Sequence, residues 1–325
     1  MNTSEIVYLK ALPMVRRLEY LEVFLRGVRD KLDRNEINVA LGERKKAFEI
    51  EKDLALGRGK PHRKDITQAK RLLKYCIRLT KELEFVHKVD SSYELDDIGK
   101  TYLESDFPTR RRIFSDAFSN VYPHLRIIVM ALLHLDGTEA VLPLGNKPKF
   151  EPEAEKFGFS IGQMYFDTVR DIGTSLGFMN WYVSGIGLER RQHLYLASQI
   201  VKNEPESYIV RIRNRDQWLY AVPFEVQRKS FRDSLWEYYL FLAEGIPGAP
   251  VFYSSVREHV CAALKLRDDQ FDNEVMRMVN SDEILQVIWS EGVLQYRKDT
   301  ASMLKSLPPK NEWGRYVVYL KIVKR

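Results

Sequence analysis

The chain has 325 residues, 45% of them hydrophobic and 30% charged, a balance that excludes an intrinsically disordered protein and allows two or three folded modules. Its 51 Lys and Arg outnumber its 45 Asp and Glu, so the net charge is +6 and a polyanion is the first class of partner to consider. The two cysteines, Cys76 and Cys261, lie far apart, which argues against a disulfide framework and fits a reducing cytosol. The N-terminus lacks a signal pattern, and no apolar run approaches the roughly 20 residues of a membrane span. We therefore expect no membrane partner and a cytoplasmic protein, nucleoid-associated if prokaryotic.

Hydrophobic periodicity predicts a mainly α fold with short β-hairpins, in which one order of elements occurs three times. The first part is expected to contain helices at 15–32, 41–56, 67–85 and 98–104, with strands at 85–89 and 93–95. The second is expected to contain helices at 125–135, 152–157 and 161–178, with strands at 178–183 and 194–196. In the third, helices are expected at 231–243, 253–264 and 270–279, with strands at 208–213, 283–289 and 316–323. Linker-like stretches fall at 105–112, 202–207 and 245–250. The first two separate these parts, so the predicted domains are 1–110, 111–205 and 206–325.

The stretch RGKPHRKDITQAKRLLKYCIRLTK, residues 58–81, holds nine Lys or Arg and a single acid, Asp65. On an ideal helix the apolar residues of this stretch share one side, and the opposite side carries Thr67, Lys70, Arg71, Lys74, Arg78 and Lys81. Arg58, Lys60, Arg63 and Lys64 precede this helix. A phosphate backbone would relieve the repulsion between such cations, so the pattern predicts a DNA-binding helix, with a solvated charged surface as the alternative.

The segment LEFVHKVDSSYELDDIGKTYLES resembles the winged-helix superfamily, in which a strand pair is followed by Y-x-L-T-x-x-G entering a helix. Tyr93, Leu95 and Gly99 match this motif, and Asp96 replaces the usual Thr as an equally good cap. The later segments PHLRIIVMALLHLDG, LGFMNWY and RRQHLYLAS are similar in order to the paired winged helices in the DNA-recognition region of some type IIS restriction endonucleases. The resemblance covers about residues 40–200 and implies a multi-domain, tandem winged helix-turn-helix protein. It also implies a DNA contact from the turn that holds Arg190 and Arg191.

The sequence shows no recognisable motif for catalysis or for binding a metal or cofactor. Glu43-Arg44-Lys45 has a spacing seen in nuclease sites, but it falls in an expected helix without a preceding strand. The six histidines lack HxxxH and HExxH spacing, and no phosphate-binding or dinucleotide-binding glycine loop is present. We therefore predict no catalytic residue, no metal site and no cofactor.

The leading hypothesis is a non-catalytic, double-stranded DNA-binding protein that acts as a regulator or as the recognition subunit of a defence or mobile-element system. In that role a protein partner would supply any catalysis. Two alternatives stay open: a winged-helix scaffold subunit of a larger protein complex, and a nuclease with an unrecognised site.

Overall fold

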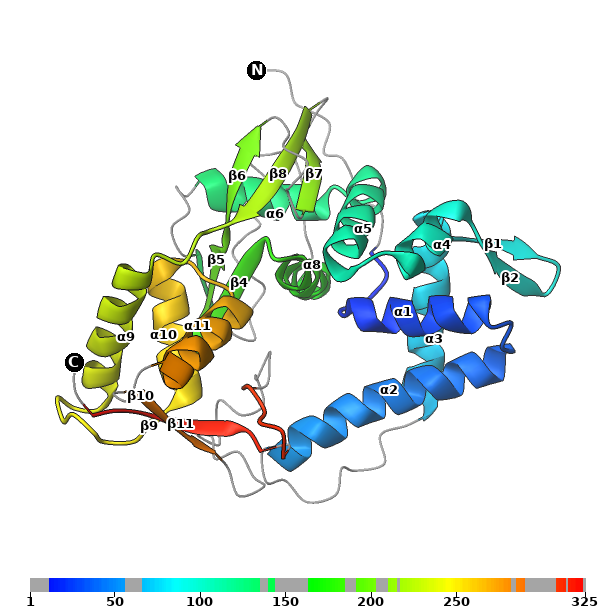
Figure 1. The fold of residues 1–325 in the computed structure, drawn as a ribbon. Helices are drawn as coiled ribbons and strands as arrows, with labels where there is room; N and C mark the ends of the chain where they lie inside the picture. Colours follow the sequence, from blue (N-terminus) through cyan, green and yellow to red (C-terminus); the bar gives the residue numbers. More distant parts are fainter. Residues whose placement is uncertain are drawn as a thin grey trace.

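The computed structural model describes residues 12–55, 66–134, 140–143, 163–184, 191–202, 210–214, 217–281, 285–289, 308–313 and 315–323. Within these ranges, helices are combined with small antiparallel sheets of two or three strands, and the β1–β2 hairpin (residues 86–95) projects at one edge (Figure 1). The expectation of a mainly helical chain with β-hairpins is therefore met at this coarse level. No helix in the described ranges is long and apolar enough to cross a membrane.

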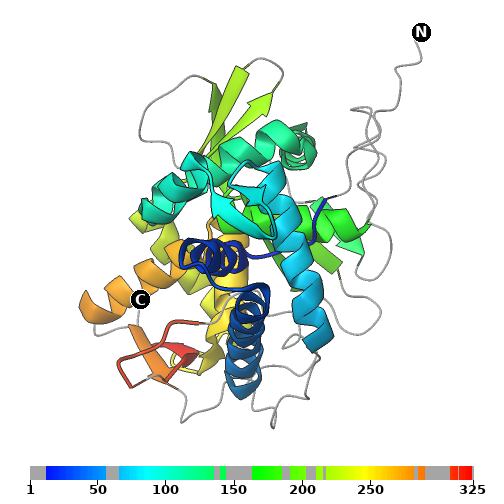
Figure 2. The same cartoon turned by 90° about the vertical axis from the view of Figure 1, so that its right-hand side faces the viewer.

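The N-terminal unit consists of packed helices followed by a β-hairpin and a short helix. Its elements are α1 (Leu18–Arg29), α2 (Arg34–Ala55), α3 (Ile66–Glu82), β1 (Val86–Val89), β2 (Ser92–Leu95) and α4 (Asp97–Glu104). Helix α3 crosses α1 and α2 (Figures 1 and 2), and β1 pairs with β2 in register from Val86–Leu95 to Val89–Ser92. Several boundaries differ from the expectation: α1 is shorter at both ends than 15–32, α2 begins at Arg34 rather than at residue 41, and α3 begins at Ile66, one residue before the predicted cap Thr67.

The middle unit joins helices to a sheet of three strands. It comprises α5 (Phe107–Val121), α6 (His124–His134), β3 (Ala140–Pro143), α8 (Gln163–Leu176), β4 (Met179–Ser184) and β5 (Arg191–Leu196). The strand order is β3-β5-β4, so β5, the last strand of the unit, lies between β3 and β4 and pairs with both.

Helix α5 corrects the prediction of a linker at 105–112. Asp106 caps it, since its carboxylate accepts a hydrogen bond from the backbone N–H of Thr109 at 2.9 Å, and Pro108 lies in the first turn. Hydrogen bonding by the side chain of Thr109, and then by its backbone N–H, lowers the pKa of Asp106. The basic run Arg110 to Arg112, which lies in the stretch predicted as a linker, is therefore part of a capped helix.

A second sheet follows, formed by β6 (Ser198–Lys202), β7 (Val210–Asn214) and β8 (Gln217–Pro223) in the order β6-β8-β7. Strands β6 and β8 were not anticipated. Arg211 of β7 forms an ion pair with Asp116 of α5 and stacks over Trp218, with its guanidinium 5.1 Å from the ring centroid. This ion pair fixes the second sheet against α5.

The C-terminal unit repeats the strand order of the middle unit. Its elements are α9 (Arg228–Leu242), β9 (Val251–Phe252), α10 (Tyr253–Leu264), α11 (Asp268–Ser281), β10 (Leu285–Trp289) and β11 (Val317–Ile322). The sheet order β10-β11-β9 again pairs the first strand of the unit with the last, as in β3-β5-β4. Two stretches far apart in sequence have thus folded into the same arrangement.

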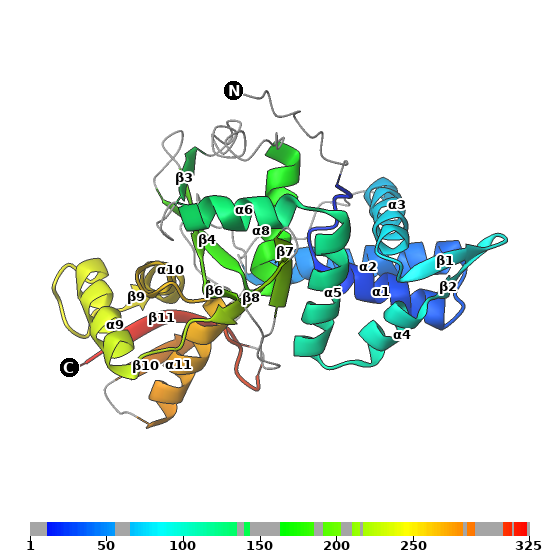
Figure 3. The same ribbon diagram turned by 90° about the horizontal axis from the view of Figure 1, so that it is seen from above.

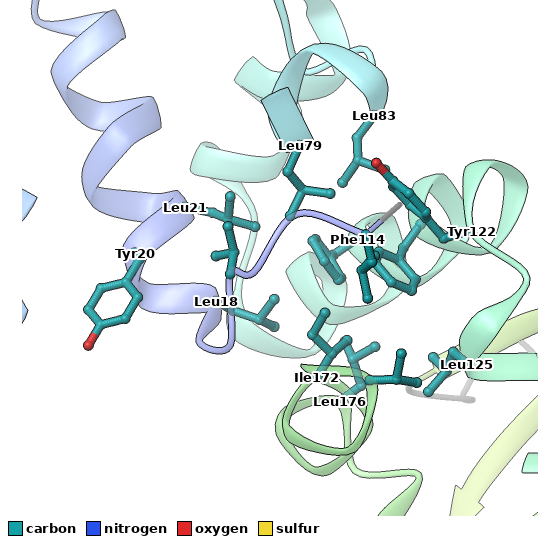
Figure 4. Close-up of a cluster of buried hydrophobic side chains, with 14 of the residues drawn as sticks. Leu18, Tyr20, Leu21, Leu79, Leu83, Phe114, Tyr122, Leu125, Ile172 and Leu176 are labelled. Atoms are coloured by element: carbon teal, nitrogen blue, oxygen red, sulfur yellow. The ribbon is translucent and has the colours of Figure 1, made fainter. Parts of the chain in front are cut away.

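Two hydrophobic cores hold these elements together. The larger core runs without interruption from α1 and α3 into α5, α6 and α8, and it also takes in buried residues of β7 and β8. Figure 4 shows Leu79 of α3, and Leu83 just after the helix, facing Phe114 and Tyr122 of the middle unit. The second core lies within the C-terminal unit, between Phe231 and Ile322. The N-terminal and middle units therefore share one core, whereas the C-terminal unit has its own.

Candidate nucleic-acid interface

Helix α3 has one buried face and one basic face, as the spacing of its residues predicts. Leu72, Leu73, Cys76 and Leu79 are at most 9% exposed and belong to the larger core. We call the opposite side the basic face of α3; it consists of Lys70, Arg71, Lys74, Arg78 and Lys81. All of these are exposed except Arg78, which is half-buried. Because the apolar side is packed against α1 and α2, the basic face is held toward solvent.

Cys76 and Thr80 fix the buried side of the helix. The Cys76 thiol donates to the carbonyl oxygen of Tyr20 in α1, at 3.8 Å, and the Thr80 hydroxyl donates to the Cys76 carbonyl at 2.7 Å. Burial raises the pKa of the Cys76 thiol well above its ordinary value, so the thiolate form is suppressed. Cys76 is accordingly a packing residue, as the sequence indicates.

One member of the basic face has an acidic partner that the sequence analysis overlooked. Arg78 donates from Nε to Glu82 Oε1 at 3.1 Å, an i,i+4 pair on α3. Among the described residues, no carboxylate forms an ion pair with Lys70, Arg71, Lys74 or Lys81. The unbalanced charge of the helix therefore resides mainly in these four cations.

A pocket of about 320 Å³ adds two residues that the sequence analysis missed, Arg34 and Tyr93. It is lined by Arg34 from the start of α2, by Tyr93 from β2, and by Lys74, Ile77, Arg78, Lys81 and Glu82 of α3, with Glu82 paired to Arg78. Four cations from two helices therefore converge on one concave surface, a geometry suited to a phosphate group.

Arg34 owes its position to a capping box that is visible in the sequence as Asp33-Arg34-Asn35-Glu36. The Asp33 carboxylate accepts the backbone N–H of Glu36 at 2.8 Å, and the Glu36 carboxylate accepts the backbone N–H of Asp33 at 2.6 Å. This reciprocal pair starts α2 and sets Arg34 at its first residue. The capping-box motif is enough to predict where α2 starts, but it does not predict that Arg34 lies close to α3.

The β1–β2 hairpin is only weakly basic. Lys88 is exposed on β1, but the turn consists of Asp90 and Ser91. His87 on the same strand lies with Nδ1 2.8 Å from the carboxylate of Asp96, the residue at the N-cap of α4. Asp96 thus takes the cap position that the sequence predicts, while its side chain holds the hairpin.

Several residues of the predicted site fall in parts of the chain that are not described. Arg58, Lys60, Arg63, Lys64 and Arg190 lie outside the described residues, and the side chains of Thr67 in α3 and Arg191 in β5 do as well. Their role stays a prediction.

The corresponding helices of the other two units are not basic. Helix α8 has two aspartates and one arginine, and Arg170 is bound by Asp167 at 3.2 Å and by Asp171 at 2.6 Å. Helix α11 has four carboxylates and one arginine. Of the described helices that precede a hairpin, α3 therefore has the only concentration of cations.

Acidic and metal-ligating residues do not converge in the described part of the chain. No group of three or more His, Cys, Asp or Glu side chains there could hold a metal ion. Glu43 of the Glu43-Arg44-Lys45 triplet is an exposed residue within α2, in keeping with the helical position expected for it.

Comparison with known proteins gives two similar solved structures. The structure of restriction endonuclease FokI aligns with a TM-score of 0.30 and 12% identity, covering 89% of this chain and 64% of that chain. The structure of FokI bound to DNA aligns with a TM-score of 0.27 and 12% identity, covering 92% of this chain and 66% of that chain. The chain thus spans about two thirds of the length of FokI, and at these values the similarity is weak and at the level of the fold. No protein-family model and no curated protein matches the sequence.

Proposed function

We propose that the chain binds double-stranded DNA through the basic face of α3, without catalysing a reaction on it. The observation that carries this proposal is the concentration of Lys70, Arg71, Lys74 and Lys81 on the exposed side of a helix whose other side is buried. Two of these residues, Lys74 and Lys81, line a pocket together with Arg34, which adds a cation from a second helix.

The energetics favour a polyanionic partner over a merely solvated surface. Like charges at i,i+4, such as Lys70 and Lys74, cost some tenths of a kcal/mol per pair in an isolated helix. Phosphate groups remove this repulsion, and each cation that neutralises one releases a condensed counterion. A surface evolved only for solubility does better with both signs interspersed, as the Arg78–Glu82 pair illustrates.

The proposed fold is a tandem array of winged helices, with modules at 1–110, 111–205 and 206–325. The shared strand order of the middle and C-terminal units supports a common module, and the N-terminal unit has helices followed by a hairpin. In this scheme α3 is the recognition helix, which enters the major groove so that Arg71, Lys74 and Arg78 reach base edges or phosphates. Arg58, Lys60, Arg63, Lys64, Thr67, Arg190 and Arg191 complete the proposed DNA-binding residues.

In its biological role the chain would be a regulator or the recognition subunit of a defence or mobile-element system, located with the DNA in the cytoplasm. A protein partner would then supply any cleavage.

A protein-docking function is the second candidate, and one observation favours it. Trp313 is 74% exposed and Phe241 70% exposed in the C-terminal unit, and exposed aromatic residues are typical anchors of protein interfaces. Other aromatic residues of the C-terminal unit are less accessible, since Tyr316 is 6% exposed and Trp289 is half-buried against the second core.

The test is binding to a labelled random duplex over a range of salt concentrations. The variant Lys70→Gln/Arg71→Gln/Lys74→Gln removes three cations from the basic face. The control Lys202→Gln/Arg315→Gln/Lys321→Gln removes the same charge from three separate surface positions. We expect the α3 variant to lose affinity by tenfold or more at low salt, and the slope of log K against log salt to fall by about 2 to 3. The control should stay close to wild type.

Equal losses in the α3 variant and in the control would mean that only net charge matters, and absence of wild-type binding at low salt would reject the proposal. A single strand that competes better than the duplex would move the partner to another class of nucleic acid. Capture of a protein that depends on Trp313 and not on α3 would favour the docking function.

A further inference from the structure

A second cationic pocket lies in the C-terminal unit. It has a volume of about 390 Å³ and is lined by Arg228, Lys229, Arg232, Arg277, Met278 and Ser281. The first three come from the start of α9 and the others from the last turns of α11. Four cations from two helices thus surround one cavity, as they do at the pocket beside α3.

The start of α9 is electrostatically unfavourable by itself. Three cations lie at the end of a helix where the backbone dipole is positive, and the first turn contains no acid. Its N-cap, Gln227, makes no side-chain capping hydrogen bond. An anion in the pocket would relieve both the charge repulsion and the unmet backbone donors.

The nearby acid offsets only part of this charge. Glu274 forms an ion pair with Arg277, donated from Nε at 3.1 Å, and it also attracts Arg228. Arg228 and Lys229 are exposed and form no hydrogen bond or ion pair with a described residue. These two side chains are therefore available to a ligand.

The pocket is remote from the basic face of α3. In Figures 1 and 3, α9 lies at one end of the molecule, while α3 and the β1–β2 hairpin lie toward the other. A ligand that reaches both surfaces must be long and negatively charged along its whole length, and duplex DNA has these properties.

We infer that the pocket of Arg228, Lys229, Arg232 and Arg277 binds backbone phosphates of the same DNA outside the α3 footprint. This inference rests on the proposed function. It assigns to the C-terminal unit a positioning contact that carries no sequence information, in contrast to the base contacts proposed for α3.

The test compares a labelled duplex of about one helical turn with one of about four turns, each over a range of salt concentrations. In Arg228→Gln/Lys229→Gln we expect about tenfold weaker binding to the long duplex and a salt slope lower by about 2, with the short duplex unaffected. The matched control Arg315→Gln/Lys321→Gln removes the same charge from the C-terminal unit outside the pocket and should bind both duplexes like wild type. Arg228 and Lys229 are both exposed, so the thermal midpoint of Arg228→Gln/Lys229→Gln should equal that of the wild type.

The outcomes separate the two proposals. If the α3 variant loses binding while Arg228→Gln/Lys229→Gln equals the control on the long duplex, this inference is wrong and the proposed function stands. If the wild type binds neither duplex, both fail.

Discussion

At the scale of single residues, burial decides which ionisable groups act as structure. His124 begins α6 and is fully buried beside Tyr122, with ring centroids 5.9 Å apart. Burial lowers the pKa of His124 to about 4. Its position at the positive end of a helix also disfavours the charged form.

His124 should make the chain less stable in mild acid. The unfolded state binds a proton near pH 6.5 and the folded state only near pH 4, so stability falls as pH drops through this window. The loss should approach about 3 kcal/mol. Denaturant unfolding at several pH values, for the wild type and for His124→Gln, measures it.

Three buried carboxylates change stability with pH in the opposite direction, so the wild type must be compared with His124→Gln. Burial raises the pKa of Asp116, Asp171 and Asp272, and these groups add stability as pH falls. His124→Gln should remove only the histidine contribution. An unchanged dependence between pH 6.5 and 4 in that variant would rule out His124 as its source.

At the scale of elements, the N-terminal unit depends on the close approach of α4 to the strand pair. A Cβ atom on Gly99 would lie 2.1 Å from the carbonyl oxygen of Phe85, which also accepts the backbone N–H of Asp96 at 3.0 Å. The glycine of the winged-helix-like motif is therefore required by backbone packing, independently of any ligand.

Gly99→Ala should destabilise this unit, because the contacting atom is backbone and cannot rotate away. We expect the free energy of unfolding to fall by about 2 to 3 kcal/mol. Thr101→Ala, an exposed change on the same helix, should stay within about 0.5 kcal/mol of wild type. Chemical denaturation measures both, and equal stability of the two variants would contradict the packing argument.

At the scale of the whole molecule, a small polar interface joins the middle and C-terminal units. The Asn180 amide of β4 donates to the Leu266 carbonyl and to the Asp268 carboxylate, both at 3.0 Å, and the Tyr195 hydroxyl donates to the same carbonyl at 3.1 Å. On the other side, Arg257 is 2% exposed and holds Asp272 at 3.0 Å. Two carboxylates of α11, Asp268 and Asp272, therefore form contacts within the protein. This internal role accounts for the acidic character of the helix.

Asn180→Ala/Tyr195→Phe should uncouple these units. It leaves the buried Leu266 carbonyl without its two side-chain donors, at a cost of about 1 to 3 kcal/mol. Calorimetry should then show the C-terminal unit, which has its own core, unfolding before the rest. A single transition with the wild-type midpoint would show that other contacts carry the coupling; Gln199→Ala, an exposed change on β6, is the control.

Much of the N-terminal unit follows from its sequence. The spacing of Leu72, Cys76 and Leu79 predicts the helix and its buried side, and the turn at Asp90 predicts the hairpin. These signals are local, because helical and strand periodicity depend only on neighbouring residues. Helix α5 was missed although its signals are local too, an N-cap at Asp106 and a proline in the first turn.

Other features depend on residues that only the tertiary structure brings together. A periodic pattern indicates that a face is buried, but it does not specify which element covers it. The packing of elements distant in sequence therefore places Arg34 in one pocket with Lys74 and Tyr93, and Arg228 in another with Arg277. The sequence by itself determined the basic face of α3. The tertiary structure decided which cations converge on a pocket and which acidic helix is used to join two units, because convergence depends on long-range packing.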